Sequence, residues 1–152
     1  MRILLTGANG QVGWELSNRG AKRGLEILAL DRSALDITDM ISVSREVNRP
    51  GVSLVVNAAG YTAVDEAESE PELAFAVNRD GPAYLASACE KVGIPLVHIS
   101  TDYVFDGQKQ GAYLETDPVS PLSIYGKSKA AGEVAVRKHL REHFILRTGW
   151  VY

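Results

Sequence analysis

The chain has 152 residues and a formal net charge of -3 at pH 7. That length fits one domain, large enough to fold around its own core without a metal or a disulfide. Apolar residues make up 45% and charged residues 23%, which is typical of globular domains and excludes disordered or membrane-embedded composition. Because a phosphate-backbone binder needs clustered Lys and Arg, the charge also argues against a nucleic acid partner.

The ends of the chain and its cysteine content give three further expectations. Cys89 is the only cysteine, so no intrachain disulfide can form, and a reducing cytoplasm is the expected compartment. The apolar stretch at residues 1–7 is too short for the core of a signal peptide. The chain stops at residues 149–152, directly after an expected strand, so we expect it to be the N-terminal part of a longer protein.

Short apolar runs alternate with longer segments of helical period. The runs, each expected to be a buried strand, lie at 3–6, 25–30, 52–57, 95–100 and 144–147. The expected helices lie at 11–19, 39–48, 71–92 and 123–140, with 71–92 forming two helices that meet near Gly81 and Pro82. A short extra strand is expected at 35–38. This alternation predicts an α/β fold with an open, doubly wound parallel sheet.

The glycine-rich run at residues 7–13, GANGQVG, follows the first expected strand and opens the first expected helix. Gly7 permits the tight turn, Gly10 lets the backbone approach a pyrophosphate, and Gly13 lets helix and strand pack closely. The helix N-terminus adds amide donors and a positive dipole. This context predicts a Rossmann-type NAD(P)-binding domain, although an ordinary glycine-rich turn is the simpler alternative.

Two other strand ends fit the same cofactor. Asp31 ends the second strand, where a carboxylate can accept both ribose hydroxyls of an adenosine, which favours NAD. Arg32 follows and could bind a 2′-phosphate, so the choice between NADH and NADPH stays open. The third strand ends in the small residues 57–60, which leave room for a flat cofactor. A solvated strand end and a plain turn are the alternatives.

Tyr125 and Lys129 are four residues apart at the start of the last expected helix, so they share one helix face. A carbonyl that receives a hydride needs a proton on its oxygen, and a phenol becomes a useful acid-base group when an ammonium stabilises its phenolate. Ser100 and Thr101 end the preceding strand at the sheet edge where such folds bind ligands. The spacing alone is common on amphipathic helices, but a strand-end hydroxyl, Tyr125 and Lys129 on the same sheet edge as the glycine loop together predict a carbonyl reductase.

At this point the sequence resembles the extended short-chain dehydrogenase/reductase family over its whole length. The stretches that carry the resemblance are GANGQVGWEL at 7–16, NAA at 57–59, TAVD at 62–65, ESEPE at 68–72, STDYVFDG at 100–107, YGKSK at 125–129 and RTGWVY at 147–152. Members of this family are about twice as long and bind a nucleotide-sugar with their C-terminal half. The resemblance therefore implies that residues 1–152 form the NAD(P)-binding domain, which carries the catalytic residues and lacks most of the substrate domain.

The resemblance implies an oxidoreductase that uses NADPH or NADH to reduce the 4-keto group of dTDP-4-dehydro-6-deoxy-L-mannose. The expected catalytic residues are Thr101, Tyr125 and Lys129, and the expected substrate contacts are Thr101, Asp102, Tyr103 and Trp150. The expected cofactor contacts, from the glycine loop, the strand ends and the resemblance together, are Gly7, Gly10, Gln11, Val12, Gly13, Asp31, Arg32, Asp36, Ile37, Ala58, Ala59, Gly60, Tyr61, Thr62, Tyr125 and Lys129.

Several alternatives remain open. A nucleotide-sugar epimerase or dehydratase keeps the same Tyr and Lys, and the regulatory β-subunit of methionine adenosyltransferase keeps the fold as a non-catalytic binding partner. Some relatives bind magnesium at a subunit contact, which makes Glu15 a candidate ligand and a homodimer a possible assembly by resemblance only. His139 and His143 lack a third ligand, so no spacing predicts a metal site. His98, in a buried run, is expected to be a satisfied core residue.

Overall fold

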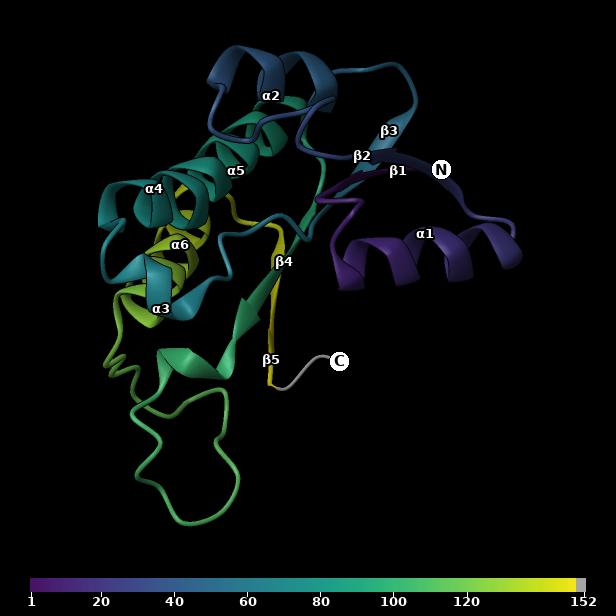
Figure 1. The fold of residues 1–152 in the computed structure, drawn as a ribbon. Coiled ribbons are helices and arrows are strands. Elements are labelled where there is room, and N and C mark those ends of the chain that lie inside the picture. The colour runs from purple at the N-terminus through teal and green to yellow at the C-terminus, as the bar shows by residue number, and fades with distance from the viewer. Residues whose placement is uncertain (150–152) are drawn as a thin grey trace.

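The computed structural model describes residues 1–149. In this range five parallel strands form one sheet in the order β2-β1-β3-β4-β5 (Figure 1). Their bounds are β1 Arg2–Thr6, β2 Glu26–Leu30, β3 Val52–Asn57, β4 Leu96–Thr101 and β5 His143–Thr148. Because the order reverses at β1, the carboxyl ends of β1 and β3 flank the switch point where open α/β sheets bind ligands. The predicted parallel α/β sheet is confirmed.

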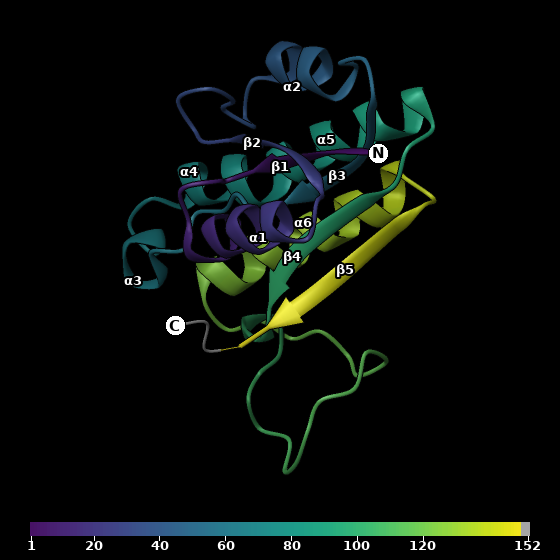
Figure 2. The same ribbon diagram turned by 90° about the vertical axis from the view of Figure 1, so that its right-hand side faces the viewer.

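The helices cover the two faces of the sheet unequally. Figures 1 and 2 show α1 on one face, and α2, α5 and α6 on the opposite face. The bounds are α1 Gln11–Lys22, α2 Met40–Val47, α3 Val64–Ala67, α4 Pro71–Phe75, α5 Gly81–Val92 and α6 Ile124–His139, with a π-helical turn at Ala76–Asp80 and a 3₁₀ turn at Asp102–Val104.

Local sequence explains several of these boundaries. Asp39 caps α2 by accepting a hydrogen bond from the Ile41 amide, and Ser123 caps α6 by accepting one from the Gly126 amide. Gly93 ends α5 in the left-handed conformation at φ 70°, which glycine adopts without steric cost. The capping residues that mark the helix ends in the sequence therefore make the contacts that begin and end these helices in the structure.

The segments at 35–38 and 71–92 are the main differences from the sequence prediction. The extra strand at 35–38 is wrong: the segment is a turn, and Leu35 and Ile37 are buried against the helical face of the sheet. Their alternation anchors a loop to the core instead of pairing with a strand. The expected junction within 71–92 is confirmed, because α5 begins at Gly81, but a π-helical turn joins it to α4.

The core lies between the sheet and the α2, α5 and α6 layer, where Leu4, Val55, Leu85 and Leu96 are fully buried. The other face is covered only in part. In Figure 2, α1 lies on the side of β1 and β2, and no helix is drawn in front of β5. Accordingly the β5 residues Phe144 and Leu146 keep 64% and 50% of their surface exposed.

None of the helices within residues 1–149 is long and apolar enough to cross a membrane.

Candidate active site

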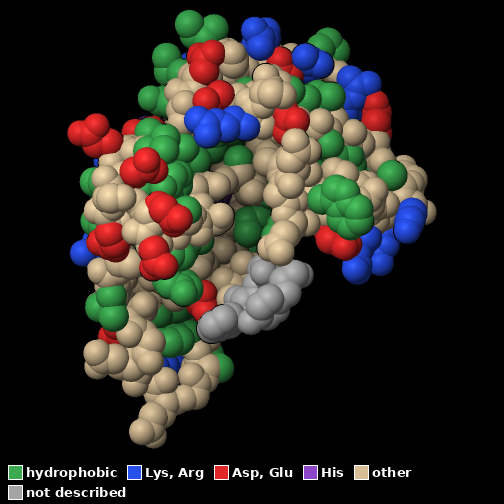
Figure 3. Space-filling model, in the orientation of Figure 1, with side chains coloured by type: hydrophobic (Ala, Val, Ile, Leu, Met, Phe, Trp, Pro, Cys, Tyr) green, Lys and Arg blue, Asp and Glu red, His purple; other side chains and the backbone are tan. Residues whose placement is uncertain are grey.

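A groove follows the carboxyl edge of the sheet, and Figure 3 shows it as a hollow in the middle of the molecular face. Its larger part, a cavity of about 400 Å³, lies between the start of α1 and the start of α6. A smaller cavity of about 220 Å³ extends it toward the end of β2, and both are lined by Gly10 and by residues 58–60. The groove therefore joins the glycine loop to the predicted catalytic residues.

The glycine loop is shaped by close backbone approaches. Gly7 has φ 70°, and a Cβ there would come within 2.7 Å of the Ala58 carbonyl oxygen. A Cβ on Gly13 would overlap the carbonyl oxygen of Gly7. Gly10, by contrast, faces the groove, and a Cβ there would make only an ordinary contact at 3.4 Å. Gly7 and Gly13 thus fix the loop, and Gly10 leaves space for a ligand above the first turn of α1.

The β2 end of the groove carries the residues expected at an adenosine. Asp31 accepts hydrogen bonds from Asn9 Nδ2 at 2.8 Å and from Ser33 Oγ at 2.6 Å. The hydrogen bond from Ser33, then that from the Ala34 amide, lowers the pKa of Asp31 below its ordinary value. Its carboxylate is therefore charged and held in place at neutral pH.

Arg32 lies at the same end of the groove and lines the smaller cavity together with Asp36 and Ile37. Its Nε is 3.7 Å from Asp36 Oδ2, and its side chain is 77% exposed. Such a loose, solvated pair leaves the guanidinium free to turn toward another anion. A carboxylate and a guanidinium therefore stand side by side in sequence at the end of the groove where the sequence predicts the adenosine.

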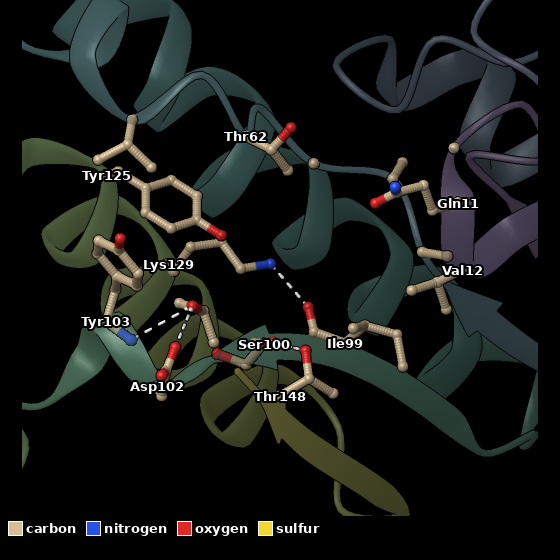
Figure 4. A pocket seen from close by; sticks show the side chains of 16 residues that line it. Gln11, Val12, Thr62, Ile99, Ser100, Asp102, Tyr103, Tyr125, Lys129 and Thr148 are labelled. Carbon is tan, nitrogen blue, oxygen red and sulfur yellow. Dashed lines mark hydrogen bonds between the residues drawn. The ribbon is translucent and has the colours of Figure 1, made fainter. Parts of the chain in front are cut away.

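At the other end of the groove Thr101, Tyr125 and Lys129 line the same cavity. Figure 4 shows Tyr125 and Lys129 there. Lys129 Nζ donates a hydrogen bond of 2.7 Å to the carbonyl oxygen of Ile99 in β4. Thr101 Oγ1 donates to Asp102 Oδ1 at 3.2 Å and accepts from the Tyr103 amide at 3.3 Å. The structure thus brings together a hydroxyl, a phenol and an amine that lie up to 28 positions apart in the sequence.

Burial sets the protonation of the phenol and the amine. It raises the pKa of Tyr125 above the ordinary value of 10.0, and the nearby Thr101 side chain acts in the opposite direction. It also lowers the pKa of Lys129 to about 8, against the attraction of Glu133. At neutral pH the phenol carries its proton and the amine is mostly charged, which is the pairing that proton donation to an oxygen requires.

Asn78 supports the wall of the cavity from the π-helical turn, and it is 1% exposed. Its Oδ1 accepts from the Tyr61 amide at 2.9 Å, and its Nδ2 donates to the Tyr61 carbonyl at 2.9 Å and to Ser128 Oγ at 3.0 Å. Asn78 therefore fastens the segment after β3 to helix α6. Sequence reasoning misses this residue, although an asparagine inside a helical pattern is a signal that its side chain binds backbone.

A buried polar chain lies beneath the groove. Asn57 Oδ1 accepts from Thr6 Oγ1 at 2.7 Å and from the Ala59 amide at 3.2 Å, which fixes the orientation of its amide. Its Nδ2 therefore donates to His98 Nδ1 at 3.1 Å. Within residues 1–149, His98 Nε2 has no hydrogen-bond partner. The expectation of a satisfied core histidine holds for one ring nitrogen and is wrong for the other.

Most residues predicted to form the site lie along the groove. The two cavities are lined by Gly7, Gly10, Gln11, Val12, Arg32, Asp36, Ile37, Ala58, Ala59, Gly60, Tyr61, Thr62, Thr101, Asp102, Tyr103, Tyr125 and Lys129. Gly13 is buried behind the loop, and Asp31 stands at the end of β2. Trp150 lies outside the described residues. Sequence reasoning misses Val64 and Ile99, because apolar side chains carry no chemistry that marks them, and it also misses Thr148, whose hydroxyl donates to the Ser100 carbonyl oxygen.

The structure gives no support to a magnesium site. Across residues 1–149, His, Cys, Asp and Glu form no group of three or more that could hold a metal ion. Glu15, the candidate ligand by resemblance, accepts a hydrogen bond of 2.6 Å from Arg19 Nε on the surface of α1.

The fold and the groove at its carboxyl edge define a Rossmann-type domain of the short-chain dehydrogenase/reductase class. The model of the RmlD substrate binding domain family matches residues 1–152, and the chain belongs to that family. It is 47% identical, over 100% of its length and 51% of the relative, to a dTDP-4-dehydrorhamnose reductase from Sinorhizobium fredii. The chain thus spans about half the length of this curated relative.

Solved structures give the same result. A dTDP-4-dehydrorhamnose reductase from Clostridium acetobutylicum matches with a TM-score of 0.96 and 42% identity, over 100% of this chain and 54% of that one. The enzyme from Bacillus anthracis, solved in complex with NADP, matches with a TM-score of 0.95 and 40% identity, over 99% of this chain and 54% of that one.

Proposed function

We propose that this chain binds NADPH or NADH along its groove and supplies the proton-transfer residues for reduction of the 4-keto group of dTDP-4-dehydro-6-deoxy-L-mannose to dTDP-L-rhamnose. The observation that carries the proposal is the convergence of Thr101, Tyr125 and Lys129 on the cavity that also holds the glycine loop. The similarity to proteins named dTDP-4-dehydrorhamnose reductase supports the same reaction. Residues 1–152 are then the NAD(P)-binding domain of that enzyme.

The groove fits a dinucleotide. Gly10 and the first turn of α1 offer backbone amides at the middle of the groove, and the larger and smaller cavities extend from there in two directions. Such an arrangement suits a pyrophosphate with a nucleoside on each side. Asp31 and Arg32 would hold the adenosine, and the space beside residues 58–62 would take the nicotinamide half.

When bound, NADPH or NADH would be the source of the hydride for the carbonyl carbon. Tyr125 donates its proton to the carbonyl oxygen, because burial keeps the phenol protonated until the substrate arrives. The Lys129 ammonium stabilises the phenolate that remains, and its other N–H groups can hold a ribose while one binds the Ile99 carbonyl. Thr101 polarises the same oxygen. Asp102 and Tyr103, on the adjoining wall, would face the sugar.

The test is oxidation of NADPH or NADH by the full-length protein with the 4-keto sugar nucleotide, followed as loss of absorbance of the reduced cofactor. Tyr125→Phe removes only the acidic hydroxyl, so we expect kcat to fall roughly 10²- to 10⁴-fold while the cofactor Kd stays nearly unchanged. Tyr84→Phe is the matched control, because Tyr84 lies in α5 away from the groove and should keep full activity.

The outcomes separate the alternatives. Conversion of the sugar without net oxidation of the cofactor would favour an epimerase or dehydratase. Cofactor binding without any conversion would favour a regulatory subunit. If Tyr125→Phe kept its turnover, Tyr125 would not be the acid.

The compartment and assembly remain part of the proposal. Cys89 is a free thiol that is fully buried in the core, which suits a reducing cytoplasm. A homodimer stays a prediction that rests on family resemblance.

A further inference from the structure

Glu133 is a buried carboxylate beneath the catalytic end of the groove. It is 1% exposed and lies one helical turn after Lys129 on α6. Its Oε1 accepts hydrogen bonds from Ser100 Oγ at 2.7 Å and from Arg147 Nε at 2.8 Å. Its Oε2 accepts from Arg147 Nη2 at 2.6 Å and from Arg137 Nη2 at 3.0 Å. One carboxylate thus joins α6 to the ends of both β4 and β5.

The strand partner Ser100 stands between two groups of the candidate site. Ile99, before it, accepts the hydrogen bond from Lys129, and Thr101, after it, presents its hydroxyl to the cavity. Two consecutive residues of β4 are therefore tied to two residues of α6 that are four apart. These ties fix how far the Lys129 ammonium can stand from the Thr101 hydroxyl.

The strand β5 completes this connection. Arg147 is the register partner of Ser100 in the parallel pairing of β4 with β5. The Arg147 guanidinium binds both carboxylate oxygens of Glu133 and also lies over the ring of Phe105, with 4.9 Å between Cζ and the ring centroid. A bidentate pair of this kind holds an orientation as well as a distance.

A contribution to stability does not by itself explain the buried ion pair of Glu133 and Arg147. Replacing a buried ion pair by apolar side chains of similar volume is often neutral or stabilising, because two charges lose their hydration on burial. Burial opposes the charge of Glu133, yet hydrogen bonds from Arg147 and Ser100 outweigh it and hold the pKa of the carboxyl below its ordinary value. The site therefore keeps a negative charge where an apolar contact would serve the fold.

That charge lies in a region with several other ionisable groups. His98 and Glu133 act electrostatically on Lys129, or it on them. The ionisable residues that line the cavity with Lys129 are Asp102, Tyr103 and Tyr125, and Arg147 on β5 faces Glu133. Burial lowers the pKa of His98 to about 3, so this ring is neutral and adds no charge. Glu133 acts to raise the pKa of Lys129, against the burial that lowers it.

We propose that Glu133 is a positioning residue for the reaction: its carboxylate fixes Thr101 relative to Lys129 and supplies the negative charge that favours the Lys129 ammonium. The proposal rests on the proposed reductase function. It explains why a fully buried carboxylate spans the helix and both strands at this point.

The first test is Glu133→Gln in the full-length protein. We expect kcat to fall roughly 10- to 100-fold, because small misplacements of reacting groups have effects of that size. The alkaline limb of the kcat profile should move to lower pH, because Lys129 loses a counter-charge. The cofactor Kd should change little. Arg137→Ala is the matched control: this guanidinium is 46% exposed and gives one bond from the solvent side, so its loss should leave the profile in place.

A second variant separates positioning from folding. Glu133→Gln combined with Arg147→Gln removes both members of the buried Glu133–Arg147 ion pair, so we expect its unfolding free energy to recover toward the wild-type value while kcat and the pH profile do not. Recovery of kcat together with stability would overturn the proposal, because Glu133 would then serve the fold alone.

A third measurement does not depend on turnover. The pH titration of Lys129, followed by NMR of isotope-labelled lysine and assigned with Lys129→Met, should move to lower pH in Glu133→Gln. An unchanged titration would overturn the proposal. If the wild-type protein fails to reduce the sugar, the proposed function fails, and the Lys129 titration still decides whether Glu133 sets the state of this amine.

Discussion

The two ends of the groove are built in different ways. At the glycine loop the shape of the groove depends on residues close together in the sequence, 7–13, where Gly7 and Gly13 leave no room for a Cβ. At the catalytic end the surface is made of side chains from β4 and α6, which Glu133 and Arg147 join beneath the cavity. The first end therefore depends on steric space, and the second depends on buried charge.

Lys129 gives the largest expected effect at the catalytic end. Its buried ammonium should raise kcat and lower the free energy of unfolding. Lys129→Met removes the charge beside Tyr125, so we expect kcat to fall by roughly 10³-fold. Burial lowers the pKa of Lys129 from 10.5 to about 8, so the unfolded chain binds more protons between these values. The buried ammonium therefore lowers stability below pH 8, and this effect disappears as the pH rises toward 10.5.

The lowered pKa of Lys129 corresponds to a loss of about 3 kcal/mol in the free energy of unfolding below pH 8. Lys129→Met should thus be at least as stable as the wild type at neutral pH, and this advantage should shrink at alkaline pH. Urea unfolding at both pH values measures it. A Lys129→Met variant that is as active as the wild type would contradict the catalytic role of Lys129. A variant that is destabilised at neutral pH would contradict the stability cost of the buried ammonium.

Gly7→Ala tests the steric end. The new Cβ would meet the Ala58 carbonyl and the Ala59 amide, so the loop must move, and we expect the cofactor affinity to fall roughly 100-fold. Gly24→Ala is the matched control, because Gly24 has a similar φ of 74° but nothing within 4 Å of the added Cβ. It should lose about 1–2 kcal/mol of stability and no cofactor affinity. Fluorescence titration with NADPH compares the two variants; similar Kd values would remove the special role of the loop.

We expect the free energy of unfolding to fall in mild acid because of His98, which lies beneath the catalytic end of the groove. Burial lowers the pKa of His98 from 6.5 to about 3, so the unfolded chain binds more protons in this interval, and stability is lost as the pH falls below 6.5. The loss from this group is about 2 kcal/mol at pH 5. His98→Asn keeps an acceptor for Asn57 but does not titrate.

The measurement is the unfolding free energy of wild type and His98→Asn at neutral pH and at about pH 5. Carboxylates titrate in both proteins, so the difference between them isolates the histidine. We expect the gap between the two proteins to narrow as the pH falls. A constant gap would place the acid sensitivity elsewhere.

The same contrast explains what the sequence can predict. The glycine loop, the strand ends and the Tyr125–Lys129 spacing are contiguous or one turn apart, so their patterns are visible in one sequence. Asn78 acts through Tyr61 and Ser128, which lie 17 and 50 positions away. Glu133 acts through Ser100, 33 positions away. No local pattern encodes such pairings.

The strand predicted at 35–38 is wrong because a local pattern can fit two structures. Leu35 and Ile37 alternate as strand residues do, but strand alternation and two anchors of a loop give the same short pattern. Tertiary packing decides between them. The open face of β5 is likewise not visible in the sequence, because Phe144 and Leu146 are apolar residues of the kind found in buried strands.

The smallest expected effect concerns cofactor choice at the β2 end. Arg32 is loosely paired, so it can be removed without disturbing the glycine loop. Asp31 accepts hydrogen bonds from Asn9 of that loop and from Ser33, so its removal also takes away one contact of the loop. Arg32→Ala should weaken NADPH binding about tenfold, because it removes one charge-assisted contact to a phosphate, and should leave NADH binding nearly unchanged. Asp31→Ala should weaken NADH binding instead, because the ribose hydroxyls lose their acceptor. Kd values for both cofactors and both variants test this; equal losses for the two cofactors would show that this end of the groove does not select between them.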